Sequence, residues 1–203
     1  MLEEEYQPRR RLPRHLRPAP PPEPTFSFSV RPATEADLPS IREIYNHYVA
    51  NSTVTFDEKR WTLRGLRAKF AHVQKLGYPF IVAVSPTDQV LGFAYVYPWK
   101  EKAAYRYTVE NSIYLGPAST GKGLGTALLE ELMERSREAG VKEIIAVIAD
   151  RGADASIRLH EKFGFRQTGA MGRVGYKFDR WLGIVLLQKS LGPSKSQPAD
   201  ARR

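Results

Sequence analysis

The sequence predicts one α/β domain in which helices cover a central sheet of mixed strand direction. Strand-like and helix-like segments follow one another in the order β-α-α-β-β-β-α-β-α-β-β. Only one helix connects the two central strands, so the chain does not repeat the βαβ unit of a fully parallel sheet. A chain of 203 residues with 42% hydrophobic residues can bury one sizeable core, and it is too short for two typical domains.

The first segments read as a strand and two helices. Residues 26–31 alternate between apolar and polar side chains, as a strand with one buried face does. Thr34 and Asp37 have the spacing of a capping box, which predicts that a helix begins there. A second helix follows a loop around Phe56. The apolar stripes of the two helices are Leu38, Ile41, Ile44, Tyr45 and Tyr48, and then Leu63, Leu66, Phe70 and Val73.

The middle of the chain predicts three strands. Residues 80–84 and 90–97 form a hairpin signature around the turn 85–89. Residues 99–105 are a charged connection, and residues 107–115 form the next strand. The remaining elements are a helix over 124–139, a buried strand over 143–149, a helix that begins at Asp154 or Ser156, and two strand-like ends of a glycine-rich hairpin over 166–188.

Composition excludes several classes of chemistry. The chain has no cysteine, which excludes disulfides, thiol catalysis and cysteine-ligated metals. No apolar run approaches the roughly 20 residues that span a bilayer, and no signal peptide is evident, so we expect a cytoplasmic protein. We predict a disordered Pro/Arg-rich leader over residues 1–25, a domain over 26–191 and a disordered tail over 192–203. Part of the net charge of +9 lies in these ends, and the charge left in the domain suits a phosphorylated cofactor better than a nucleic acid.

A glycine-rich loop precedes the helix over 124–139. Gly121, Gly123 and Gly125 have no Cβ, so the N–H groups at the start of the helix can surround an anion. We therefore expect a phosphorylated ligand at this loop. An ordinary turn and helix cap is the alternative without a function.

Two common nucleotide loops do not fit these residues. A dinucleotide loop, G-x-G-x-x-G, loses its third glycine when it is laid on the sequence. The pattern G-x-x-x-x-G-K of nucleotide hydrolases fits from Gly116 to Lys122, and Asp150 follows a hydrophobic strand as a metal-binding acid does. Position 123, however, is a glycine where that loop needs a hydroxyl for magnesium, and the motif comes too late for a doubly wound sheet. A pyrophosphate-binding loop is the remaining interpretation.

The loop T-G-K-G-L-G resembles the signature Gln/Arg-x-x-Gly-x-Gly/Ala of the GNAT superfamily of acyl-CoA N-acyltransferases. Gly123 and Gly125 match the signature, and Thr120 stands where Gln or Arg is usual. The resemblance implies the GNAT fold, a mixed and mostly antiparallel sheet with splayed central strands, flanked by helices. Five further segments resemble the phosphinothricin N-acetyltransferase branch, namely residues 53–56, 98–105, 107–115, 146–150 and 156–165.

This resemblance implies acetyl-CoA as the co-substrate and no metal. The backbone of Ile113, Tyr114 and Leu115 would bind the pantetheine arm. The pyrophosphate would be surrounded by Gly121, Lys122, Gly123, Leu124, Gly125 and Thr126. The family often has an asparagine at the position of Ala153, so Ser156 is the contact that we expect from the next helix.

Acetyl transfer to an amine needs a base, because amino-acid amines are mostly ammonium ions at neutral pH. Glu110 stands at the position of the branch's catalytic glutamate by resemblance, and strand alternation places it on one face with Thr108, Ser112 and Tyr114. Without the resemblance it would read as a solvated strand carboxylate. The absence of cysteine makes direct attack by the amine simpler than a covalent intermediate.

His160 is the second catalytic candidate. Many GNAT enzymes have a tyrosine at the equivalent place, which can protonate the departing thiolate, and the phosphinothricin branch has histidine. A histidine with a pKa of about 6.5 can act as an acid or a base near neutral pH. Its place on an apolar helix face with Ile157 and Phe163 leaves a hydrogen-bonded core histidine as the alternative.

The expected acceptor site is formed by Phe56, Lys100, Lys102 and Tyr105, which resemble the segments that hold an amino acid in this branch. Lys102 stands where arginine is common, so the two-pronged hydrogen bonding of a guanidinium is lost. The segment Trp181-Leu182-Gly183 replaces the usual Trp-His-Asp. For the lysines, a solvated charged loop is the alternative.

The predicted function is acetyl transfer from acetyl-CoA to the primary amine of a small amino acid or analogue, of the phosphinothricin or methionine sulfone and sulfoximine type. Members of this branch are commonly dimers, so the resemblance also implies a homodimer. A membrane or nucleic-acid partner is not expected. Two alternatives remain open: an acyl-CoA-binding regulatory module without catalysis, and an RNA- or ribosome-associated protein that acts through its basic leader.

Overall fold

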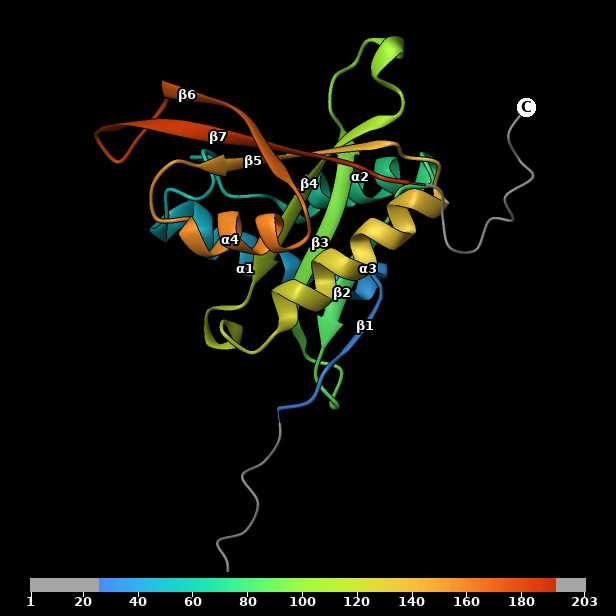
Figure 1. The fold of residues 1–203 in the computed structure, drawn as a ribbon. Coiled ribbons are helices and arrows are strands. Elements are labelled where there is room, and N and C mark those ends of the chain that lie inside the picture. The colour runs from blue at the N-terminus through green and yellow to red at the C-terminus, as the bar shows by residue number, and fades with distance from the viewer. Residues whose placement is uncertain (1–25, 193–203) are drawn as a thin grey trace, which may run out of the picture.

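Seven strands form the central sheet of the computed structural model, which describes residues 26–192. Their order across the sheet is β1-β2-β3-β4-β5-β7-β6 (Figure 1). The strands are β1 (Ser29–Pro32), β2 (Phe80–Val84), β3 (Val90–Pro98), β4 (Thr108–Leu115), β5 (Glu143–Ala149), β6 (Arg166–Lys177) and β7 (Arg180–Ser190). The α-helices are α1 (Leu38–Asn51), α2 (Leu63–Lys75), α3 (Leu124–Glu138) and α4 (Asp154–Lys162). This element order is the one that the sequence predicts.

Strands β4 and β5 form the one parallel pair in the described sheet. They pair over only three positions, from Thr108 opposite Glu143 to Glu110 opposite Ile145. Strand β4 stays paired with β3 as far as Leu115, whereas its pairing with β5 stops at Glu110. The two central strands therefore splay apart, as Figure 1 shows. The predicted mixed, mostly antiparallel sheet with splayed central strands is confirmed.

The two faces of the sheet carry separate cores. Helices α1 and α2 cover one face, where their apolar side chains pack on Phe80, Phe93 and Tyr95. Helix α3 packs on the other face, with Leu128 and Leu132 in the same cluster as Val109. Figure 1 shows α3 and α4 in front of the sheet and α1 and α2 behind it. A side chain of β4 therefore faces one of two different environments, according to its place in the strand alternation.

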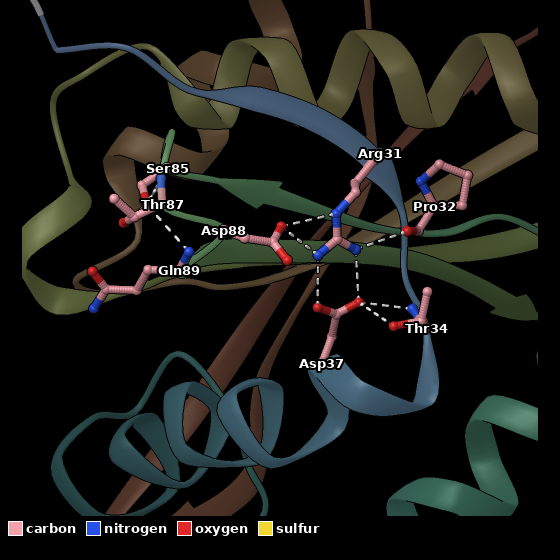
Figure 2. A network of polar contacts seen from close by, with 8 residues as sticks. All are labelled: Arg31, Pro32, Thr34, Asp37, Ser85, Thr87, Asp88 and Gln89. Atoms are coloured by element: carbon pink, nitrogen blue, oxygen red, sulfur yellow. Dashed lines mark hydrogen bonds and ion pairs between the residues drawn. The ribbon is translucent and has the colours of Figure 1, made fainter.

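Arg31 joins three segments at the edge of the sheet (Figure 2). Its Nη1 and Nη2 donate to the two carboxylate oxygens of Asp37 at 2.8 and 2.9 Å, and Nη2 also donates to Asp88 at 2.8 Å. Asp37 also accepts a hydrogen bond of 2.7 Å from the backbone N–H of Thr34. The predicted capping box is thus confirmed, and it is tied both to β1 and to the turn between β2 and β3.

The predicted glycine-rich hairpin is wrong in one respect. The glycines of this segment lie inside strands, three in β6 and one in β7, and the turn is formed by Phe178 and Asp179 at φ of +52° and +56°. Positive φ at both central residues is the geometry of the tight hairpin turn. Gly175 has a different reason, because a Cβ at this position would lie 2.4 Å from the ring of Phe56. That glycine marks a close approach to a neighbouring loop.

The predicted leader over residues 1–25 lies outside the described residues, as does the predicted tail apart from Gly192. None of the helices within residues 26–192 is long and apolar enough to cross a membrane.

Candidate active site

The loop before α3 has the backbone of an anion-binding turn. Gly121 and Gly123 adopt φ of +75° and +82°, and open space lies where their Cβ atoms would be. Gly123 is the N-cap of the 15-residue helix α3 and supplies no side chain to cap it. The first N–H groups of an α-helix have no partner within the helix, so they are available to a negative group. Gly125 has another role, since its Cβ would lie 3.2 Å from Leu159 of α4.

The side chains of this loop point to backbone recognition. Leu124 is fully buried, so only its backbone can contact a ligand, whereas Thr126 is half-buried. The ammonium of Lys122 donates to the carbonyl of Ala118 at 3.0 Å and lies 4.4 Å from the ring centroid of Phe26. The loop therefore offers N–H groups and one cation to an anion.

The end of β4 supplies the neighbouring backbone groups. Ile113, Tyr114 and Leu115 lie beyond the last position at which β4 pairs with β5. Tyr48 of α1 already donates a hydrogen bond of 2.7 Å to the carbonyl of Leu115. The ring of Tyr114 packs edge-on against Tyr45 at 5.0 Å. The side chain of Tyr114 is therefore committed to the core on the α1 and α2 face, which leaves its backbone for a ligand.

Asn111 is the first residue of β4 beyond the segment that pairs with β5, and no sequence motif marks it as a functional residue. Its side chain is 7% exposed, and its Nδ2 lies 2.8 Å from Nε2 of His160. Its Oδ1 is buried and has no hydrogen-bond partner among the described residues. An unpaired buried acceptor costs about 1–3 kcal/mol, so a ligand donor at this position would be favourable. The pantetheine arm of acetyl-CoA carries amide N–H groups, which could donate a hydrogen bond to Oδ1 of Asn111. The residues at this end of β4 therefore fit acetyl-CoA.

His160 is held from both sides. It is 3% exposed, and its Nδ1 donates to the carbonyl of Ser156 at 2.8 Å. That bond places the proton on Nδ1, so Nε2 accepts from Asn111. Burial lowers the pKa of His160, and the hydrogen bond to the backbone of Ser156 opposes this shift. The structure thus describes a neutral imidazole with both nitrogens engaged.

Glu110 lies on the opposite face of β4 from Asn111 and His160. It pairs with Tyr97 of β3 and is half-buried on the side of α1 and α2. Burial raises the pKa of Glu110, and the positive charges of Lys69 and Lys100 oppose the shift. A raised pKa suits a carboxylate that must take a proton near neutral pH. The two catalytic candidates are therefore not brought together on one face.

The four predicted acceptor residues do not lie together in one place. Lys102 and Tyr105 belong to an exposed short turn between β3 and β4, which includes the 3-10 segment Ala103–Tyr105. Lys100, although exposed, acts on Glu110 through its charge and lies 4.6 Å from the ring centroid of Trp99. Phe56 lines a cavity on the α1 and α2 side of the sheet.

That cavity has a volume of about 580 Å³ and lies between the loop after α1 and helix α2. Trp61 and Lys69 line it, and the sequence analysis singled out neither. Trp61 stacks on Tyr45 at 3.7 Å between ring centroids, and its Nε1 donates to Asp57 at 3.1 Å. A tryptophan in a loop and a lysine on a helix carry no motif, so only their spatial neighbours reveal them.

Lys177 is a second residue that the sequence did not indicate. Its side chain enters from β6 and is 2% exposed. Its ammonium donates to the carbonyls of Ser52 and Thr55 at 2.8 Å each. Burial lowers the pKa of Lys177, and the charges of Asp57 and Glu58 oppose the shift. This lysine fastens the β6–β7 hairpin to the loop that carries Phe56.

Two departures from the family pattern are explained by packing. Leu182 is 3% exposed and belongs to the core. A Cβ at Gly183 would lie 2.5 Å from Oδ2 of Asp150, and the N–H of Gly183 donates to Oδ1 of the same side chain at 3.2 Å. Ala153 caps α4 without a side-chain hydrogen bond, and Ser156, which is half-buried, follows in its first turn.

Comparisons with known proteins agree with this geometry. The family model described as Acetyltransferase (GNAT) family matches residues 41–165. An L-methionine sulfoximine/L-methionine sulfone acetyltransferase of Pseudomonas aeruginosa is 41% identical, over 85% of this chain and 100% of the relative. A phosphinothricin N-acetyltransferase of Alcaligenes faecalis is 38% identical, over 80% and 82%. The crystal structure of a GNAT superfamily phosphinothricin acetyltransferase from Sinorhizobium meliloti in complex with acetyl-CoA is 39% identical, with a TM-score of 0.78 over 86% and 94% of the chains.

Proposed function

The chain belongs to the acetyltransferase (GNAT) family and is an acetyl-CoA-dependent N-acetyltransferase, and we propose that its acceptor is the primary amine of a small amino acid or analogue. The relatives named for methionine sulfoximine, methionine sulfone and phosphinothricin support this acceptor class. The observation that carries it is Glu110, a half-buried carboxylate at the point where β4 and β5 part, with two lysines acting on it. A base beside cations suits an acceptor that bears both an ammonium group and an anionic group.

On the donor side, acetyl-CoA supplies an acetyl group activated as a thioester. We propose that the N–H groups of Gly121 to Thr126 and the ammonium of Lys122 hold its pyrophosphate. The backbone of Ile113, Tyr114 and Leu115 and the side chain of Ser156 would contact the rest of it. Open space at Gly121 and Gly123 and the unpaired Oδ1 of Asn111 support this assignment.

On the acceptor side, Glu110 would take a proton from the ammonium group of the acceptor. The neutral amine then forms its bond to the acetyl carbon as the carbon–sulfur bond breaks, and the departing thiolate takes up the proton that the nitrogen loses on becoming an amide. Phe56, Lys100, Lys102 and Tyr105 remain the proposed acceptor contacts. Phe56 is supported by its place in the lining of the cavity, and Lys100 by the effect of its charge on Glu110.

For His160, the geometry favours positioning over proton donation. Both ring nitrogens are hydrogen-bonded inside the protein, and burial favours the neutral ring. We propose that His160 orients Asn111, so that Nδ2 is used internally and Oδ1 is left for the donor. A proton donor would instead need an imidazolium with Nε2 turned toward the reacting sulfur.

A homodimer is the proposed assembly. Large apolar side chains of the β6–β7 hairpin are 45–53% exposed, and they are Met171, Val174, Tyr176, Phe178 and Trp181. Several exposed apolar side chains on one hairpin are typical of an interface. Sedimentation analysis of wild type and Trp181→Glu tests the assembly, since a dimer through this patch becomes a monomer in the variant.

The acceptor class is tested by thiol release from acetyl-CoA with a panel of amines. The panel contains methionine sulfone, methionine sulfoximine, phosphinothricin, a polyamine and a peptide with a free N-terminus. We expect one of the three amino acids to give the highest kcat/KM. A polyamine or peptide that exceeds all three would contradict the proposed acceptor and leave the family assignment intact.

A further inference from the structure

Lys69 of α2 lies among three aromatic rings beside the candidate base. Its Nζ is 5.0 Å from the ring centroid of Trp61, 5.1 Å from that of Tyr95 and 5.0 Å from that of Tyr97. It also donates a hydrogen bond of 3.3 Å to the hydroxyl of Tyr95. Aromatic faces attract a cation, so the three rings hold the ammonium in one place. We call Lys69 with these three rings the lysine cage.

The walls of the lysine cage are themselves fixed. Trp61 exchanges two hydrogen bonds with the side chain of Asn46, at 2.7 and 3.1 Å, and stacks on Tyr45. Tyr95 is 4% exposed and stacks on Phe80 at 4.9 Å. The cage is therefore assembled from the loop before α2, from α2 and from β3, and the rings of Trp61 and Tyr95 are held by contacts outside the cage. A rigid cation is better suited to selective binding than a mobile surface lysine.

The charge of Lys69 is not neutralised by an ion pair within residues 26–192. The hydroxyl of Tyr95 uses one of the three N–H donors of the ammonium, which leaves two for a ligand. Lys69 lines the 580 Å³ cavity, and its charge also acts on Glu110. Lys69 thus connects the cavity, which it lines, with Glu110, on which its charge acts.

We propose that Lys69 binds the carboxylate of the acceptor amino acid, an inference that rests on the proposed acceptor class. In an α-amino acid the amine and the carboxylate share one carbon, so the groups that recognise them must be neighbours. The charge of Lys69 acts on Glu110, so the two groups lie within electrostatic range of each other. Lys100 also acts on Glu110, but it is exposed, and exposed ion pairs contribute little. Lys69 is therefore the residue that selects acceptors with a carboxylate next to the amine.

The test compares two acceptors that differ only in the carboxylate, methionine sulfone and its methyl ester. A hydrogen-bonded charge pair in a partly enclosed site is worth about a 10- to 100-fold change in binding. We expect Lys69→Met to raise the KM for methionine sulfone by this factor and to change the KM for the ester by less than threefold. Lys69→Arg keeps the charge and should retain part of the preference. Lys75→Met, an exposed position on the same helix, is the matched control.

Binding of CoA, measured by calorimetry, should be the same for Lys69→Met and wild type, because the cage lies on the acceptor side. Equal losses with methionine sulfone and its ester would overturn the inference and assign Lys69 a packing role. A tenfold KM effect in Lys100→Met with none in Lys69→Met would overturn it as well. If Lys69→Met has a melting temperature well below that of wild type, Lys69→Gln is used in its place. If wild type acetylates none of the amino acids, the proposed function itself fails, and the inference with it.

Discussion

Two consecutive residues of β4 serve opposite faces of the sheet. Glu110 faces α1 and α2, where the cavity and the lysine cage lie, and Asn111 faces α4, where it is bonded to His160. The proposed donor side relies largely on backbone groups: a helix start, two glycines in the left-handed region and a strand end that is paired with β3 but no longer with β5. The proposed acceptor side relies on side chains from distant segments. Backbone recognition tolerates changes of side chain, so we expect the choice of amine to depend on the acceptor side.

The largest effect is expected at Glu110. Glu110→Gln removes the proposed base, and the loss of general-base catalysis typically costs about 100- to 10,000-fold in rate. We expect kcat/KM to fall by that factor at neutral pH, while CoA binding by calorimetry stays within twofold. Glu43→Gln, an exposed glutamate on α1, is the matched control and should keep wild-type turnover. If Glu110→Gln keeps wild-type turnover, Glu110 is not the catalytic base.

The donor face is tested by a pair of glycines at the two ends of α3. Gly123 and Gly140 have nearly the same φ, +82° and +83°, and open space where a Cβ would be. Alanine at either position carries a similar left-handed strain of about 1–2 kcal/mol. We expect Gly123→Ala to weaken CoA binding about tenfold and Gly140→Ala to leave it unchanged, with similar falls in thermal stability. Equal CoA affinities in the two variants would show that the loop is only a helix cap.

A smaller effect is expected at Asn111. Loss of one neutral hydrogen bond of about 1 kcal/mol corresponds to roughly a fivefold change in affinity. Asn111→Leu should weaken CoA binding by this factor, and His160→Phe should weaken it less, because Asn111 remains present. The matched change on the other face, Lys69→Met, should have no effect on CoA affinity. If Asn111→Leu binds CoA with wild-type affinity, the unpaired Oδ1 of Asn111 does not contact CoA.

The same contrast explains what could be predicted from the sequence. The anion loop and the strand face of Glu110 follow from local rules, namely glycines before a helix and alternation along a strand. The role of Glu110 as a base was implied only by the resemblance to the family. No local sequence pattern identifies Lys69, Trp61 and Lys177, because their surroundings are formed by segments that are distant in the sequence. The glycines over 166–188 predict a hairpin turn, but one of them, Gly175, instead makes room for Phe56. Local sequence does not distinguish a glycine that allows a turn from one that allows a close approach.

The pH dependence of kcat/KM in wild type, Glu110→Gln and His160→Phe tests the central claim most directly. The groups whose charges act on Glu110 are Lys69 of α2 and Lys100 of the β3–β4 connection, and Tyr97 lies opposite on β3. Glu110 must be deprotonated to act as a base, so kcat/KM should fall as the pH decreases. Because burial raises the pKa of Glu110, the midpoint of this acidic limb should lie above the usual pKa range of carboxyl groups. We predict that Glu110→Gln loses this limb and that His160→Phe keeps it with a wild-type midpoint. Loss of the limb in His160→Phe, with its retention in Glu110→Gln, would contradict the account.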